Sequence, residues 1–166
     1  MNPFDNLIKE IAAILKKKNW QLVTAESCTG GLVASYLTDI PGSSVWFERG
    51  FVTYSNLAKE ELLSIPKQLI EEYGAVSEPV AQAMATGALQ HSAGHVAVSV
   101  TGIAGPDGGS LEKPVGTVCF GWAAKDINSK VVRKQFTGNR QDIRLAACEV
   151  VLSGLLSYIK NGKNFY

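Results

Sequence analysis

The stretch LVTAESCTGGLVASYLTDI, residues 22–40, changes character in its middle. Leu22 to Ala25 is a short apolar, β-branched run that predicts a strand, whereas from Leu32 onward the apolar residues recur at helical spacing. Such a turn presents a side chain at the strand end, and the N–H groups of the helix start point at whatever lies beside it. Ser27, in the turn at 26–31, is the residue so presented.

Two glycines in this turn, Gly30 and Gly31, allow a ligand to approach the backbone closely because they carry no side chain. The positive end of the helix dipole favours an anion or an oxyanion at the same place. The turn is therefore predicted to receive a negatively charged group.

The composition is that of an ordinary soluble globular protein. The chain has 166 residues, of which 46% are hydrophobic and 19% charged, and its formal net charge is +1. This length predicts one domain, residues 1–166. The balanced charge argues against a nucleic-acid partner, which usually requires a basic surface.

Cysteine usage and the N-terminal residues indicate the compartment. Cys28, Cys119 and Cys148 are odd in number and lack metal or redox spacing, so they are interpreted as reduced thiols. The lysines at 16–18 follow the first apolar residues, the reverse of a signal peptide, and no apolar run is long enough to span a membrane. We expect a cytoplasmic protein with no membrane contact and no bound metal.

Helical and strand patterns alternate along the chain, which predicts an α/β sandwich around a central sheet. Because the last two strands are consecutive, the sheet is predicted to be mixed and mainly parallel. Helices are expected from residue 2, over 32–40, from 55 or 56 to about 63, from 77 to about 90 and over 139–160, and a turn or helix is expected from 66 to about 74. Strands are expected at 22–25, 50–54, 95–101, 115–124 and 131–136.

A serine nucleophile needs a base, and this chain has two histidines, His91 and His95. Both belong to the exit of a predicted helix, and nothing places them at the Ser27 turn. A lysine or a carboxylate is therefore the expected base if Ser27 is catalytic.

Lys59 is the preferred lysine because it lies in the first turn of a predicted helix, where the dipole disfavours a positive charge. If Asn56 is the cap, Lys59 occupies the position that a capping box gives to Glu or Gln. A lysine destabilised as a cation can act as a base near neutral pH. The alternative is an ordinary exposed lysine beside Glu60 and Glu61.

Two neighbours of these residues have competing interpretations. Tyr54, at the end of a predicted strand, could bridge Lys59 and Ser27 through its hydroxyl, or could simply pack. Cys28 could be a rival nucleophile, but no histidine is placed to activate it, so a small buried thiol is expected.

A glycine-rich loop and a pair of arginines could hold a phosphate. The loop runs from Thr101 to Ser110, is neither a Walker A loop nor a Rossmann fingerprint, and could equally be a mobile surface connection. Arg140 and Arg144 share one face of the last helix and could bind a phosphate or lie on a solvated face. The loop residues predicted to bind substrate are Thr101, Gly102, Gly105, Gly108 and Gly109.

Four blocks closely resemble the CinA C-terminal domain family, whose stand-alone members include nicotinamide-nucleotide amidases. These are TAESCTGG (24–31), GSSVWFERGFVTYSNLAK (42–59), GAVSEPVA (74–81) and TGIAGPDGGSLEKPVGTV (101–118). The resemblance covers nearly the whole chain. It implies a three-layer α/β/α fold, a homodimer, and hydrolysis of nicotinamide mononucleotide to nicotinate mononucleotide and ammonia without a metal.

The resemblance also implies roles for single residues. The catalytic serine of the family falls at Ser27, and its tyrosine and lysine fall at Tyr54 and Lys59. Backbone N–H groups of Thr29, Gly30 or Gly31 would then stabilise the oxyanion, and the 102–109 loop or Arg140 would hold the phosphate. A nucleotide-binding module without catalysis is the alternative, and a metal-dependent phosphatase is a third hypothesis.

Overall fold

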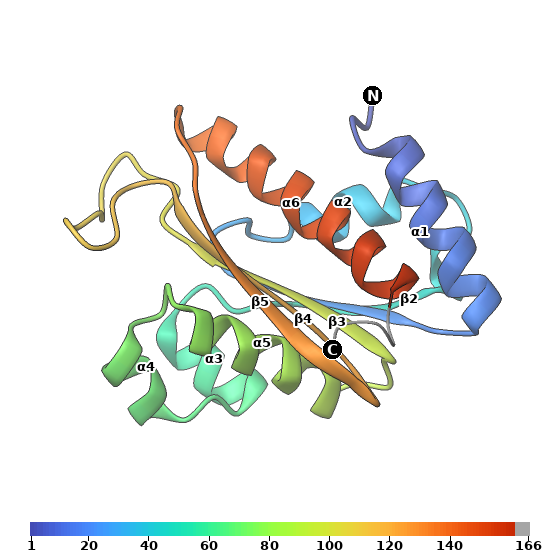
Figure 1. Ribbon diagram of the computed structural model, residues 1–166, viewed down its shortest axis with the longest axis horizontal. Helices are drawn as coiled ribbons and strands as arrows, with labels where there is room; N and C mark the ends of the chain where they lie inside the picture. Colours follow the sequence, from blue (N-terminus) through green and yellow to red (C-terminus); the bar gives the residue numbers. More distant parts are fainter. Residues whose placement is uncertain (162–166) are drawn as a thin grey trace.

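The computed structural model describes residues 1–161 and has a five-stranded sheet between two layers of helices (Figure 1). One layer contains α1, α2 and α6, and the other contains α3, α4 and α5. The predicted three-layer α/β/α sandwich is therefore confirmed. The elements are α1 (Asp5–Lys18), β1 (Leu22–Glu26), α2 (Leu32–Thr38), η1 (Ser43–Val45), β2 (Phe47–Val52), α3 (Asn56–Leu63), α4 (Lys67–Tyr73), α5 (Glu78–Gln90), β3 (Val96–Gly102), β4 (Thr117–Ala124), β5 (Ile127–Gln135) and α6 (Arg140–Lys160).

The strands follow the order β2-β1-β3-β4-β5. β1 pairs in parallel with β2 and β3, whereas β4 is antiparallel to both β3 and β5. The sheet is thus mixed, as predicted, and only β4 runs against the other strands. β1, an interior strand between β2 and β3, is buried along its whole length, which explains its continuous apolar sequence.

The carboxyl ends of the parallel strands meet at one edge of the sheet. Glu26 of β1 is aligned with Val52 of β2 and Val100 of β3. In the sheet, β1 has β2 on one side and β3 on the other, and the chain goes from β1 first to β2 and later to β3. The carboxyl ends of these strands therefore form a topological switch point, where α/β proteins bind ligands. The turn after β1, the β2–α3 connection, the loop after β3 and the start of α6 all lie at this edge.

Close packing of α5 on the sheet depends on small residues, as the small inner face of this helix suggests. A Cβ atom at Gly121 of β4 would lie 2.6 Å from the carbonyl oxygen of Ala81. The hydroxyl of Ser99 on β3 donates a hydrogen bond to the same carbonyl. The helix backbone therefore rests directly on the sheet.

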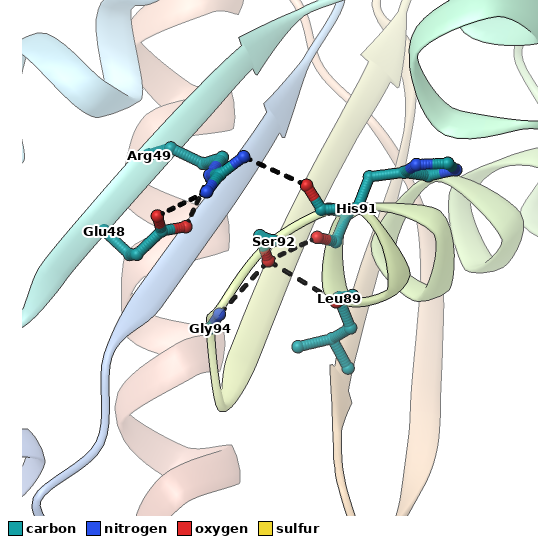
Figure 2. A network of polar contacts seen from close by, with 7 residues as sticks. Glu48, Arg49, Leu89, His91, Ser92 and Gly94 are labelled. Atoms are coloured by element: carbon teal, nitrogen blue, oxygen red, sulfur yellow. Dashed lines mark hydrogen bonds and ion pairs between the residues drawn. The ribbon is translucent and has the colours of Figure 1, made fainter.

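Figure 2 shows a polar network at the opposite edge of the sheet, near the start of β2. Arg49 pairs with Glu48 at 2.6 Å and donates to the carbonyl of His91, which ends α5. The hydroxyl of Ser92 caps the same helix end and accepts from the N–H of Gly94. His91 and His95 are connector residues, as expected, and this network holds the edge strand on the α5 layer.

Two strand predictions differ from the structure. β2 spans Phe47–Val52 rather than 50–54, because its pairing with β1 begins at Phe47 and includes Arg49, which has a weak strand signal. β5 spans Ile127–Gln135 and begins four residues before the predicted start, since its first part pairs with β4 as an exposed edge strand. Among residues 1–161, no helix is long and apolar enough to cross a membrane.

Candidate active site

Ser27 and Lys59 form a direct hydrogen-bonded pair. The Ser27 Oγ and Lys59 Nζ atoms lie 3.0 Å apart, and Lys59 Nζ donates to the carbonyl of Thr53 at 2.9 Å. Lys59 is only 1% exposed and Ser27 is 7% exposed. Within the described residues, Lys59 has no ion pair with a carboxylate.

Burial is the main cause that lowers the pKa of the Lys59 amine below that of a free lysine. A charged ammonium at this place would lose its hydration, and the neighbouring carbonyl and hydroxyl groups replace that hydration only in part. A lowered pKa favours the neutral amine, whose lone pair can take the Ser27 proton. The pair therefore has the chemistry of a nucleophile and its general base.

The capping argument for Lys59, which assumed Asn56 as the N-cap, is wrong. Ser55 is the N-cap of α3, since its hydroxyl accepts from the N–H of Ala58. Lys59 is therefore the fourth residue of the helix rather than the third, and no capping-box position is violated. What singles out Lys59 is the burial of its side chain between α3 and the ends of β1 and β2.

The Ser27 turn is held by its own groups and by Glu26. Both carboxylate oxygens of this buried residue accept from first-turn N–H groups of α2, at Val33 (2.9 Å) and Ala34 (3.1 Å). This internal anion occupies the positive end of the helix that was predicted to receive a ligand. The donors left for an oxyanion are therefore in the turn itself, before the helix. Glu26 was not predicted, although a glutamate ending an apolar strand before a helix is a detectable signal.

Of the three predicted oxyanion donors, Gly30 is already used. Its N–H donates to the Ser27 carbonyl at 3.0 Å. The N–H groups of Thr29 and Gly31 have no acceptor among residues 1–161. Gly30 and Gly31 have φ angles of +60° and +102°, a conformation that explains both glycines.

A pocket of about 250 Å³ opens beside Ser27. It brings together several of the predicted residues: Ser27, Tyr54, Gly102, Gly105, Gly108 and Arg140, joined by Cys28, Ile103, Ala104 and Asp107. Thr29, Gly30, Gly31, Thr101 and Gly109 are not in its lining. The hydroxyl of Thr101 is instead bonded to the carbonyl of Ala75. Asp107, the one carboxylate in this lining, was not among the predicted site residues.

Arg140 and Tyr54 form the rim of this pocket. Arg140 donates to the Gly105 carbonyl at 2.7 Å and to the Tyr54 hydroxyl at 2.9 Å. The suggested Tyr54 bridge between Lys59 and Ser27 is absent here, because these two residues meet directly and the Tyr54 side chain is 60% exposed. A catalytic role for Tyr54 stays a prediction.

Arg144, one turn further along α6, does not share this rim. It donates to the backbone carbonyls of Cys28 and Thr29. The Cys28 thiol is buried, and this burial raises its pKa to about 12, as expected for an inert thiol.

Fold and site together define an α/β domain in which a buried lysine holds a serine at a sheet edge. The CinA C-terminal domain family model matches residues 4–159, and the chain belongs to this family. A nicotinamide-nucleotide amidohydrolase PncC from Enterobacter agglomerans is 57% identical over 92% of this chain and 93% of its own length. The protein of the same name from Escherichia coli K12 is 49% identical over 90% of each chain.

Solved structures show the same fold. A competence/damage inducible protein CihA from Agrobacterium tumefaciens superposes with a TM-score of 0.91 and 42% identity, covering 93% of this chain and 94% of that one. The domain also occurs in longer proteins. A putative competence-damage inducible protein of Symbiobacterium thermophilum is 59% identical over 73% of this chain, which corresponds to 28% of its own length.

Proposed function

We propose that this protein is a nicotinamide-nucleotide amidase, which converts nicotinamide mononucleotide (NMN) and water into nicotinate mononucleotide and ammonia in pyridine nucleotide salvage. The observation that carries the proposal is the 3.0 Å contact between Ser27 Oγ and the buried Lys59 amine. The names of the PncC relatives, which align with nearly the whole chain, supply the substrate.

In the proposed reaction, neutral Lys59 accepts the proton of Ser27 while Ser27 Oγ attacks the carboxamide carbon. The resulting oxyanion is stabilised by backbone N–H groups of the turn, each such donor being worth about 2.7 to 4 kcal/mol. Collapse transfers the Lys59 proton to the leaving amine, which departs as ammonia. Water then attacks the ester on Ser27 while Lys59 takes a proton from this water, and Lys59 returns the proton to Ser27 Oγ as nicotinate mononucleotide leaves.

The pocket lining has one cationic and one anionic side chain, Arg140 and Asp107. NMN likewise has one anionic group, its phosphate, and one cationic group, its pyridinium ring. Arg140 has no carboxylate partner among the described residues and would bind the phosphate. Asp107 would lie near the cationic pyridinium ring.

The nucleotide-binding module is the competing function, and a product assay separates the two. Purified protein is incubated with NMN and, in parallel, with free nicotinamide, which lacks the ribose phosphate. We expect ammonia and nicotinate mononucleotide from NMN and much slower release from nicotinamide. Binding of intact NMN without ammonia would favour the binding module. The homodimer stays a prediction from the family, and the cytoplasmic location stays a prediction from the cysteines and the N-terminal residues.

A further inference from the structure

The Arg144 guanidinium donates hydrogen bonds to two backbone carbonyls next to the nucleophile Ser27. Its Nε donates to the Cys28 carbonyl at 3.2 Å and its Nη2 donates to the Thr29 carbonyl at 2.9 Å. Within the described residues it forms no ion pair with a carboxylate. A guanidinium that spans two successive carbonyls fixes the planes of both peptides.

The orientation of these peptides determines where their N–H groups point. Both peptides are trans, since the only cis bond among residues 1–161 is Gly105–Pro106. In a trans peptide the N–H is antiparallel to the C=O. The N–H groups of Thr29 and Gly30 therefore point away from Arg144.

For Gly30, that direction is toward the backbone carbonyl of Ser27. The Gly30 N–H, which points away from Arg144, donates to the Ser27 carbonyl. The Thr29 N–H also points away from Arg144, belongs to a buried residue next to the pocket residue Cys28 but outside the pocket lining, and has no acceptor among the described residues. Buried N–H groups without a partner are rare, so an acceptor from a bound ligand is the natural explanation.

We infer that Arg144 is a positioning residue for oxyanion stabilisation, because it orients the Cys28–Thr29 peptide so that the Thr29 N–H meets the substrate oxygen after Ser27 attacks. This inference rests on the proposed amidase function. The hydrogen bond from the guanidinium to the Cys28 carbonyl also polarises that peptide, which strengthens its N–H as a donor. Arg140 and Arg144 thus have different tasks: Arg140 binds the substrate, and Arg144 acts only once the oxyanion forms.

Steady-state kinetics with NMN distinguish these tasks. For Arg144→Ala we expect kcat to fall about tenfold to a hundredfold with KM changed little, because a donor used only in the transition state is misplaced. Arg144→Lys offers a single ammonium in place of the planar guanidinium, so its kcat should lie between those of wild type and Arg144→Ala. Arg140→Ala should instead raise KM more than it lowers kcat.

A second readout does not need NMN turnover. A fluorophosphonate probe labels Ser27 through an adduct whose oxygen occupies the same donors. The labelling rate should fall in Arg144→Ala by a factor similar to that in kcat. Arg49→Ala, which removes another guanidinium from a backbone carbonyl at the far sheet edge (Figure 2), is the matched control and should label at the wild-type rate.

The outcomes separate the inference from the proposed function. If wild-type protein releases no ammonia from NMN but is labelled, the amidase proposal fails and the labelling rates alone test Arg144. Labelling of Arg144→Ala at the wild-type rate would overturn the inference. Equal losses in Arg144→Ala and Arg144→Lys, matched by an equal loss of thermal stability, would also overturn it, because they indicate a purely structural contact.

Discussion

Replacing Lys59 with methionine removes the amine from the Ser27 site and keeps an unbranched side chain. Lys59 is 1% exposed, and burial lowers the pKa of its amine. In the unfolded chain the same amine stays protonated up to about pH 10.4. Between its lowered pKa and about 10.4, the unfolded state therefore binds one more proton than the folded state.

This difference gives the free energy of unfolding a definite pH slope. Stability rises with pH wherever the unfolded state binds more protons, by about 1.4 kcal/mol per pH unit for one proton. Lys59→Met has no such group. The wild-type protein should therefore gain about 1.4 kcal/mol per pH unit over the variant within this window.

Urea unfolding of both proteins at several pH values between about 7 and about 10 measures this slope. Lys17→Met, which removes the amine of an exposed lysine by the same substitution, is the matched control. A flat difference for Lys59→Met, or one that shrinks as pH rises, would show that the folded protein keeps Lys59 charged. The neutral amine would then be unavailable as a base.

Three further predictions concern the pocket rim and the sheet. Tyr54→Phe removes the hydroxyl that Arg140 contacts, so KM for NMN should rise about twofold to tenfold while kcat stays nearly unchanged. A large fall in kcat would instead support a proton relay through Tyr54. Asp107→Asn removes the lining carboxylate, and we expect NMN to bind up to about fivefold more weakly in calorimetry, whereas unchanged binding would exclude its contact with the cationic ring. Gly121→Ala forces a Cβ against Ala81 and should destabilise the protein by about 1 to 3 kcal/mol in urea; wild-type stability would show that α5 can move away.

The local signals around Ser27 were sufficient to predict that part of the fold. A buried apolar strand, two glycines and a helical repeat lie within one short stretch, and the structure has β1, the turn and α2 in these places. Five helices were predicted for the same reason, since caps and apolar periodicity are local, and α4 was predicted as a turn or helix. The start of β2 was missed because its pairing with β1, and not its own sequence, decides it.

The long-range contacts of the site could not be predicted from patterns. Lys59 was identified partly through a capping argument that the structure contradicts, and its burial depends on how α3 packs against the sheet. The different hydrogen-bond partners of Arg140 and Arg144 could likewise not be predicted from the sequence. Arg144 meets a carbonyl 116 residues earlier in the chain, and the helix pattern places both arginines on one face without showing what that face contacts.

Ammonia release from NMN by wild-type protein and by Ser27→Ala tests whether this protein is an amidase with Ser27 as its nucleophile. The exposed Ser44→Ala, in the connection between α2 and β2, serves as the matched control. We expect ammonia from wild type and from Ser44→Ala, and a rate of ammonia release lower by about a thousandfold or more in Ser27→Ala. Ammonia release by folded Ser27→Ala at a rate close to wild type would contradict the role of Ser27 as nucleophile.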